Sequence, residues 1–226
     1  MLDCNLNEFI LLKLWGENMN NLTVPENNSL GYVRVFHAVP DAPNMDVYAD
    51  DTLIAENLPY GSYTDYVHLD EGTYTIMLYE TGQHRFPLLS NMLTVHSSDV
   101  FTVAVCGLLS SISFLAITDF NRLAGAVNAW VRLVHLSPDA PQLDLTQANT
   151  TFLFRNISFK QASSYSPISP EPHDLQIRMS RTTTTLLSLP DVAFESHTFY
   201  TVYAIGLISG MPAFQTVISE DSPMIK

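Results

Sequence analysis

The chain contains one fourteen-residue segment twice. Residues 33–46 read VRVFHAVPDAPNMD, and residues 131–144 read VRLVHLSPDAPQLD. Eight of the fourteen positions are identical, and each lies 98 residues after its first occurrence. A repeat of this length predicts two copies of one structural unit in tandem, so the fold of one copy constrains the fold of most of the chain.

Matches outside this segment extend the repeat to about 90 residues per copy, a size sufficient for a small domain with its own core. The matching pairs are Asn57 with Asn156, Tyr66 with Tyr165, and Gly107 with Gly206. The sequence therefore predicts four segments: a flexible leader over 1–31, a first β-sandwich repeat over 32–119, a linker over 120–129 and a second β-sandwich repeat over 130–226.

The leader lacks the features of a secretory signal. Asp3 stands where a signal peptide carries positive charge, and Lys13 interrupts a short apolar run. Residues 20–30 are polar and rich in turn-forming residues. Met19 offers a second start, so residues 1–18 are expected to form a short helix or to lie upstream of the native start. No stretch is long enough to cross a bilayer as a helix, so membrane insertion is not expected.

Composition and charge indicate a globular, acidic protein. The chain is 46% hydrophobic and 15% charged, which is typical of a folded rather than a disordered chain, and its net charge is −13. Such a surface repels nucleic acid and anionic membranes, so neither is an expected partner; capture of cations is the alternative interpretation of the charge. Cys4 lies in the leader and Cys106 in an apolar run, so no disulfide framework is expected.

Alternation of apolar and polar residues, rather than a helical period, dominates both copies. Short runs rich in Val, Thr, Ile, Tyr and Phe end repeatedly at turn-forming residues. The predicted fold class is all-β, with two tandem immunoglobulin-like β-sandwich domains. The strands predicted in the first copy are Tyr32–Ala38, Met45–Ala49, Thr52–Ala55, Tyr63–Leu69, Thr73–Tyr79, Leu88–Val95, Phe101–Cys106 and Ile112–Ile117, and the clearest in the second are Trp130–Leu136, Thr151–Phe154, Leu175–Met179 and Phe199–Ile205.

The repeated segment is predicted to form a rigid corner between two strands. Two prolines in each copy fix the backbone and remove hydrogen-bond donors, so the chain must leave the sheet there. The aspartate between them can bond its own downstream amides, as in an Asx-turn. A histidine lies just before each corner and a second aspartate just after it. The corner residues are His37, Pro40, Asp41, Pro43 and Asp46 in the first copy, and His135, Pro138, Asp139, Pro141 and Asp144 in the second.

Two interpretations of the repeated histidines and aspartates remain open. In the structural one, each histidine is buried and bonded to an aspartate or to the corner backbone. In the functional one, His37 with Asp41 or Asp46 binds a metal or acts as a general base. A metal site needs three or four ligands, and acid–base catalysis needs a second reacting group, yet neither recurs in both copies. The prediction is a structural corner, with no catalytic residue, no metal site and no cofactor.

Other recurring or clustered residues receive structural interpretations as well. Arg34 and Arg132 are expected to form cross-strand ion pairs with acidic neighbours, of little energetic weight when exposed, with partner binding as the alternative. Aromatic residues gather in the middle of each copy, and packing on the sheet is expected in preference to a carbohydrate platform. These residues are Tyr60, Tyr63, Tyr66, Phe159 and Tyr165.

The corner segment, the following VYADDTLIAENLPYGSYTDYVHLDEGTYTIML and the closing FTVAVCGLLSSISFLAITD resemble a bacterial family, domain of unknown function 4397. The resemblance covers residues 32–221 as two copies. It departs from the family pattern at Val39, where serine is usual, and in the second copy at Leu145-Thr146 and Glu171-Pro172-His173. The resemblance implies immunoglobulin-like sandwiches, often in tandem, in cell-envelope or surface proteins. It implies no catalytic activity and no catalytic residue.

The functional prediction combines these points. The leading hypothesis is a non-enzymatic structural or protein-interaction module on a bacterial cell or spore surface, in contact with other proteins or with further copies of itself. The spore surface enters by analogy with short two-copy family members that lack a signal. The alternatives are a carbohydrate- or peptide-binding module that uses the mid-copy aromatics, and a metal-dependent hydrolase centred on His37 or His135.

Overall fold

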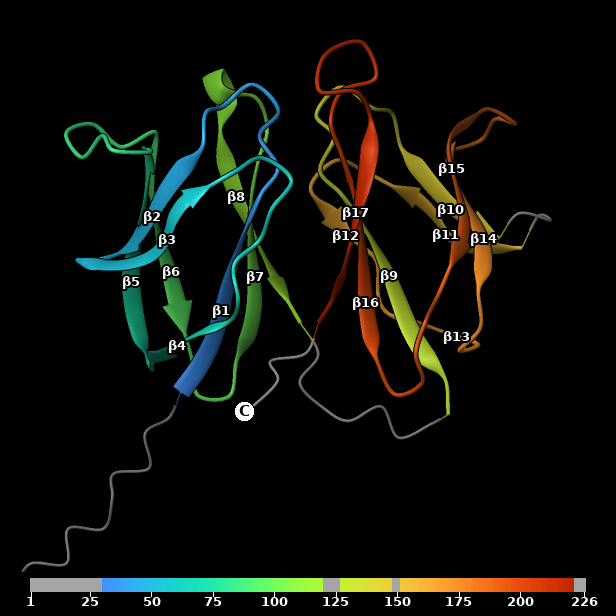
Figure 1. The fold of residues 1–226 in the computed structure, drawn as a ribbon, viewed down its shortest axis with the longest axis horizontal. Coiled ribbons are helices and arrows are strands. Elements are labelled where there is room, and N and C mark those ends of the chain that lie inside the picture. Colours follow the sequence, from blue (N-terminus) through green and yellow to red (C-terminus); the bar gives the residue numbers. More distant parts are fainter. Residues whose placement is uncertain (1–29, 120–126, 148–150, 222–226) are drawn as a thin grey trace, which may run out of the picture.

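The computed structural model describes residues 30–119, 127–147 and 151–221. Apart from a short 3-10 helix at Leu109–Ser111, every regular element of these residues is a β-strand. The strands form four sheets, and Figure 1 shows the two copies as two β-sandwiches side by side. The predicted all-β class with two tandem sandwiches is confirmed. Residues 1–29 of the predicted leader and residues 120–126 of the predicted linker lie outside the described residues, whereas Leu30 and Gly31 are part of a strand.

Unit one, residues 30–119, builds one sandwich from eight strands. They are β1 (Leu30–His37), β2 (Met45–Ala49), β3 (Thr52–Leu58), β4 (Val67–Asp70), β5 (Gly72–Glu80), β6 (Leu89–Val95), β7 (Val100–Cys106) and β8 (Ser113–Thr118). One sheet has the order β4-β1-β7-β8 and faces the second sandwich in Figure 1, so we call it the inner sheet. The other has the order β3-β2-β5-β6 and is the outer sheet.

Unit two, which runs from residue 127 to 221, repeats this arrangement. Its strands are β9 (Ala129–His135), β10 (Leu143–Gln147), β11 (Phe152–Ile157), β12 (Gln161–Ala162), β13 (Ser166–Ile168), β14 (His173–Met179), β15 (Thr185–Val192), β16 (Phe199–Ile205) and β17 (Gln215–Glu220). The inner sheet has the order β12-β9-β16-β17, and β13 also pairs with β9. The outer sheet has the order β11-β10-β14-β15.

The order of the strands in the two sheets differs from that of an immunoglobulin domain. Lettered A to H along the chain, the strands of unit one form the sheets D-A-G-H and C-B-E-F. Strands β1 and β7 run parallel, whereas the other neighbours run antiparallel. An immunoglobulin constant domain groups its strands as ABED and CFG. The likeness to immunoglobulins therefore lies in the two packed sheets rather than in the strand order.

One strand of unit one starts later than the sequence predicts. The strand predicted to start at Tyr63 starts at Val67, and Tyr63 makes only an isolated bridge to Phe36. The segment between them stays beside β1 through a side-chain contact, since the Val35 N–H donates to the Thr64 hydroxyl (3.0 Å). In unit two, β15 is not among the clearest predicted strands, and it contains Pro190, which is tolerated because β15 is an edge strand.

Each sandwich has its own apolar core between its inner and outer sheets. The core of unit one includes Val33, Val35, Met45, Val47, Ile76, Leu78 and Val103. The core of unit two includes Val131, Leu133, Leu143, Leu145, Leu175, Ile177 and Val202. These residues alternate along their strands with residues on the opposite face, as the period of two in a strand requires.

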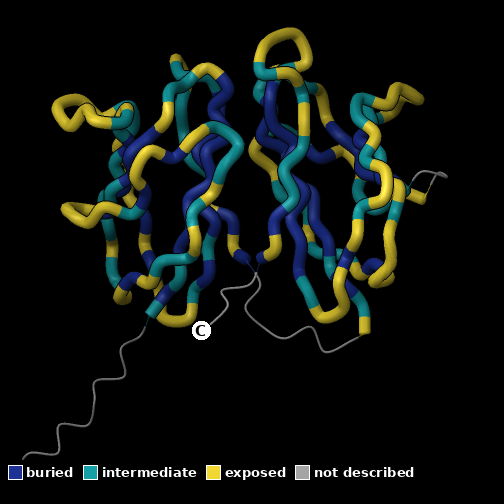
Figure 2. Tube along the Cα trace, viewed as in Figure 1, coloured by how far each residue is buried: buried dark blue, intermediate teal, exposed yellow. Residues whose placement is uncertain are grey.

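A third apolar cluster lies between the two inner sheets. Phe36 points away from the core of unit one, and its ring centroid lies 4.4 Å from that of Tyr203 in unit two. The other buried members of this shared cluster are Ala38, Ala104, Cys106, Ile117, Val134, Leu136 and Ile205. The central strands of both inner sheets are thus buried on both faces, as the dark blue segments at the centre of Figure 2 show.

Because the two units share this third cluster, we expect the full chain to unfold in one calorimetric transition. Phe36→Ala removes a fully buried ring from the shared cluster and should lower the unfolding free energy of the whole chain by about 3–5 kcal/mol. The control is Phe86→Ala, at a site that is 84% exposed, and it should change this energy by less than about 0.5 kcal/mol. Two separate transitions, of which Phe36→Ala moves only one, would contradict a shared core.

Candidate functional site

Both repeated histidines are fully buried and bonded to the backbone of their own corner. The Val39 N–H donates to Nδ1 of His37 (3.2 Å), so Nε2 carries the ring proton and donates to the Pro43 carbonyl (3.1 Å). His135 repeats this geometry, with Nε2 3.0 Å from the Pro141 carbonyl. Burial lowers the pKa of each imidazole, although the carbonyl bonds oppose this. Both rings are therefore neutral at physiological pH, and their hydrogen bonds stabilise the corner.

The aspartate between the prolines ties the corner to a distant loop. Oδ1 of Asp41 accepts the Leu109 N–H (2.7 Å), and Oδ1 of Asp139 accepts the Ile208 N–H (2.8 Å). These bonds reach across to another loop and not to the downstream amides of the same turn, as an Asx-turn would require. The prolines before these aspartates are Pro40, which is buried, and Pro138, which is half-buried.

Asp46 and Asp144 lie in the strand after each corner and do not bond to the histidines. Oδ1 of Asp46 accepts the Asn57 N–H (2.7 Å), and Oδ2 accepts the Gly82 N–H (3.0 Å). Oδ1 of Asp144 accepts the Asn156 N–H (2.7 Å). Both asparagines have left-handed backbones, with φ of 50° and 58°, so each carboxylate holds an unusual turn in place. Burial acts to raise the pKa of Asp46, but its N–H donors bring that pKa below its usual value.

The mid-copy aromatics take part in packing. Tyr60 lies edge-on to His37, with ring centroids 5.9 Å apart, and Phe159 lies in the same way against His135 at 6.1 Å. Tyr63 is 41% exposed and lies beside the inner sheet, where its backbone forms an isolated bridge to Phe36 of β1. Tyr60 and Phe159 thus lie against the corners and Tyr63 against β1, in agreement with packing on the sheet.

A cluster of charged side chains is buried between the two inner sheets. Arg34 of β1 in unit one reaches the Asp221 carboxylate of unit two, and Arg132 of β9 in unit two reaches back to Asp119 of unit one. Arg34 is 2% exposed, Arg132 3%, Asp119 4% and Asp221 0%. Each arginine also lies near the aspartate of its own unit, since Nε of Arg34 is 4.0 Å from Oδ2 of Asp119 and Nη2 of Arg132 is 3.6 Å from Oδ2 of Asp221. Ion pairs with acidic neighbours are therefore present, but they are buried rather than exposed because the other unit covers the sheet face that carries the arginines. We call this reciprocal contact the arginine–aspartate exchange.

Hydroxyl groups complete each half of the exchange. Tyr66 (2.7 Å) and Thr102 (2.6 Å) both donate to Oδ2 of Asp119. The same set recurs in unit two, with Tyr165 and Thr201 donating to Asp221. Nη1 of each arginine donates to a backbone carbonyl of the opposite unit, at 2.7 Å in both cases. Every member of this buried network therefore has hydrogen-bond partners, which burial of polar groups requires.

The exchange departs from two-fold symmetry at two positions. Arg34 also lies 3.1 Å from the Ser219 hydroxyl and 3.4 Å from the Tyr203 hydroxyl. The matching positions of unit one hold Ile117 and Ala104, which carry no hydroxyl for Arg132. Arg34 therefore has two more hydroxyl groups near its guanidinium than Arg132 has at the matching positions.

Burial shapes the protonation of the exchange. Burial acts to lower the pKa of Arg34 and Arg132, but the surrounding oxygens raise both, so the guanidinium groups stay charged. Burial first, and the nearby carboxylates second, raise the pKa of Tyr66 well above its usual value. Burial also raises the pKa of Asp119, and the Arg132 guanidinium opposes that rise. The two positive and two negative groups balance, which limits the cost of removing them from water.

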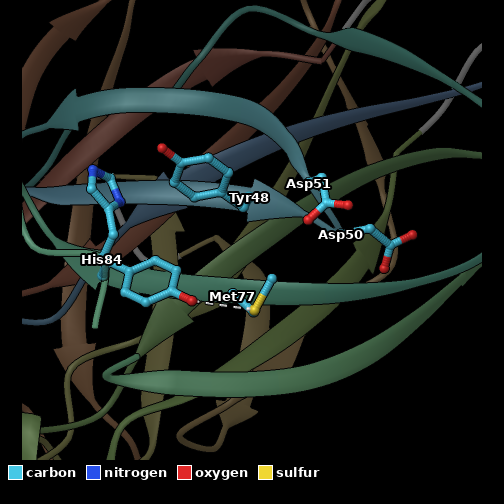
Figure 3. Close-up of a pocket in the computed structure, with 6 residues that line it drawn as sticks. Tyr48, Asp50, Asp51, Met77 and His84 are labelled. Carbon is cyan, nitrogen blue, oxygen red and sulfur yellow. Dashed lines mark hydrogen bonds between the residues drawn. The ribbon is translucent and has the colours of Figure 1, made fainter. Parts of the chain in front are cut away.

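An open pocket of about 250 Å³ lies on the outer sheet of unit one. Figure 3 shows the residues that line it, which are Tyr48, Asp50, Asp51, Met77, Tyr79 and His84. The sequence interpretation missed this pocket because it searched for residues shared by both copies, and these side chains occur in unit one alone. The available signal was the aromatic and methionine residues at outward positions of β2 and β5, where a solvated sheet face normally carries polar residues.

Within residues 30–119, 127–147 and 151–221, no group of three or more His, Cys, Asp or Glu side chains lies close enough to hold a metal ion. No helix in this part of the chain has the length and apolar character needed to span a membrane. Cys106 is buried in the shared cluster, and burial raises the pKa of its thiol, which disfavours the reactive thiolate.

Arg34→Met should leave the Asp221 carboxylate buried without its main counter-charge. We expect the unfolding free energy to fall by about 3–5 kcal/mol, measured by chemical denaturation. Combining it with Asp221→Leu should recover much of this loss, because no unpaired charge then remains. Arg85→Met, at an exposed arginine, is the control. Equal effects of the two arginine substitutions would show that the exchange contributes nothing to stability.

Stability should fall with acid because both corner histidines have lowered pKa values. Below a pH of about 6.5 these histidines become protonated in the unfolded chain while they stay neutral in the folded protein. The unfolding free energy therefore falls by up to about 1.4 kcal/mol per pH unit for each histidine. Above this pH the effect disappears. His37→Gln should flatten this dependence, whereas the control His68→Gln, at an exposed site, should preserve it. Parallel pH profiles for both variants would contradict the assignment.

Three solved structures show remote similarity to this chain. The Bacillus anthracis TIE protein is 7% identical with a TM-score of 0.26, over 79% of this chain and 34% of that one, so this chain spans about a third of its length. A family 26 carbohydrate-binding module from Eubacterium rectale Amy13K, in complex with maltoheptaose, is 11% identical with a TM-score of 0.28, over 86% and 98%. A leucine-rich repeat protein from Bacteroides thetaiotaomicron is 14% identical with a TM-score of 0.20, over 79% and 26%. These scores support no argument about function.

No curated protein is significantly similar to the chain. The family described as Domain of unknown function (DUF4397) matches the sequence twice, over residues 31–146 and 129–224. The first match begins one residue after the start of β1 and runs into β10, and the second begins at the start of β9, so the two matches overlap over residues 129–146. The chain therefore belongs to the DUF4397 family and contains two copies of its domain.

Proposed function

We propose that this protein is a non-enzymatic structural or protein-interaction module of a bacterial cell or spore surface, in which two sandwiches act as one rigid body. The observation that carries the proposal is the arginine–aspartate exchange together with the shared apolar cluster. A linker alone would let two domains rotate, whereas a buried charged network in a closely packed interface holds them in one orientation. Rigid spacing of contact surfaces is what a structural module supplies.

The roles of the repeated polar residues support a non-catalytic function. His37 and Asp46 are fully engaged with backbone groups of their own unit. The carboxylates of the exchange are closed off between the two inner sheets. A general base or a nucleophile must reach its substrate within hydrogen-bond distance, and these groups are buried and already bonded within the fold.

One sheet edge offers a surface for a protein partner. Strand β6, at the edge of the outer sheet of unit one, reads LSNMLTV and contains neither a charged residue nor a proline. Met92 is 68% exposed, and its N–H is bonded by the side chain of Asn91 (2.9 Å) rather than by a neighbouring strand. The matching edge strand β15 is protected by Pro190 and by a left-handed residue at Asp191. Edges without such protection accept an additional strand from another chain.

Self-association through β6 is the first form of partner binding to test. Residues 19–226 should form ordered assemblies visible by light scattering and negative-stain microscopy at high concentration. Met92→Lys places a charge on the open edge and should abolish them. The matched control is Ser188→Lys, an exposed position on the protected strand β15, and it should leave them intact. A clean monomer at every concentration would contradict a self-assembling building block.

A further inference from the structure

The outer sheets of the two units present different side chains at matching positions. In unit one, Tyr48 of β2 lies opposite Met77 of β5, and Tyr79 lies opposite Asp46. The corresponding pairs of unit two are Thr146 opposite Gln176, and Arg178 opposite Asp144. The aspartate is kept in both units, whereas two tyrosines and a methionine are replaced by polar residues. The apolar face of unit one is therefore not a requirement of the fold, because unit two folds without it.

The pocket on this face has an aromatic end built from three rings. Ring centroids of Tyr48 and Tyr79 lie 5.8 Å apart, and those of Tyr48 and His84 lie 5.6 Å apart, both nearly perpendicular. The Tyr79 hydroxyl donates to the Met77 sulfur (3.4 Å), the contact dashed in Figure 3. The rings thus hold one another in place, and both tyrosines remain only half-buried. A rigid and partly exposed aromatic surface binds a flat apolar group at low cost in conformational entropy.

The other end of the pocket is acidic. Figure 3 places Asp50 and Asp51 opposite the histidine, in the tight turn between β2 and β3. Oδ1 of Asp50 accepts the Thr75 N–H (2.8 Å), which fixes the orientation of this carboxylate. Oδ2 of Asp50 and both carboxylate oxygens of Asp51 accept no hydrogen bond from the described residues. These oxygens remain available for the hydroxyl or amine hydrogens of a ligand.

We infer that this pocket binds one pyranose ring of a neutral or amino sugar. Such a ring has an apolar face of C–H groups and a rim of hydroxyl groups, which match the aromatic and acidic ends of the pocket. A volume of about 250 Å³ is just below the range of pockets that take drug-sized molecules, so it suits one ring rather than an extended ligand. The C–H face packs on Tyr48 and Tyr79, and the hydroxyl groups donate to Asp50 and Asp51.

The charges of the site exclude other ligand classes. An acidic sugar would meet two carboxylates on a chain of net charge −13, so repulsion disfavours it. A purely apolar ligand would strip water from Asp50 and Asp51 without replacing their hydrogen bonds. The inference stands apart from the proposed structural role, which rests on the contact between the units and on strand β6.

The test is a titration of the full chain with neutral, basic and acidic oligosaccharides, followed by NMR chemical shifts and calorimetry. Cellohexaose, chitohexaose and maltohexaose are the neutral probes, a chitosan hexamer is the basic probe and an oligo-uronate is the acidic probe. At least one neutral or basic probe should bind with a dissociation constant on the order of 0.1–1 mM, as expected for one shallow subsite. The oligo-uronate should bind at least tenfold more weakly.

The variants use side chains that the same fold already carries in unit two. Tyr48→Thr and Tyr79→Arg install the residues found at Thr146 and Arg178, so folding should be retained, and melting temperatures confirm this. Each should weaken binding at least tenfold. Phe152→Thr removes an exposed aromatic from the outer sheet of unit two and is the matched control, with unchanged affinity.

Two results would overturn the inference. One is the absence of binding by every neutral and basic probe at 10-fold above the expected dissociation constant. The other is binding that persists in the Tyr48→Thr/Tyr79→Arg double variant, which would place the sugar elsewhere. Neither result bears on assembly through β6, because Met92→Lys is tested by microscopy rather than by sugar binding.

Discussion

The arginine–aspartate exchange is the interaction on which the rest of the architecture depends. Arg34 and Arg132 can be buried only because each finds a carboxylate, a carbonyl and a threonine hydroxyl within the interface. Because the arginines are buried, each inner sheet must be covered by its own outer sheet on one face and by the other unit on the opposite face. The apolar residues around the exchange then exclude water, which strengthens the interaction between the charges. Charge pairing and apolar packing therefore specify one orientation of the two units.

Much of this fold follows from the sequence, because the repeat fixed the number of units and the alternation fixed the strands. The corner around His37 is local, so its turn-forming prolines predict it. The partner of Arg34 is Asp221, almost the full length of the chain away, and no local pattern reveals such a contact. A signal was present nevertheless: β7 and β16 are apolar or small at nearly every position, which indicates a strand buried on both faces. Tyr66, Thr102 and Asp119 also recur in unit two, and their recurrence together marks a shared environment.

The candidate pocket required the opposite reasoning. The corners recur because both sandwiches need them, whereas Tyr48 and Tyr79 occur in one copy only. Side chains that maintain the fold are retained in both copies, and side chains that serve a particular contact are free to differ. Differences between the copies on solvated faces, such as Tyr79 against Arg178, therefore carry more information about function than the repeated segment does.

The reciprocal exchange also has a meaning for the origin of the chain. The arginine, aspartate, tyrosine and threonine that unit one contributes to the exchange each have a counterpart in unit two, so a single unit carries both halves of an isologous dimer contact. Fusion of two such units makes that contact intramolecular and raises the effective concentration of the partner. It also removes the obligation to stay symmetric: Phe36 meets Tyr203, while the matching positions hold Val134 and Ala104. The two units of this chain therefore pack like the two different subunits of a heterodimer. One unit can change its exposed surface while the contact between the units is maintained.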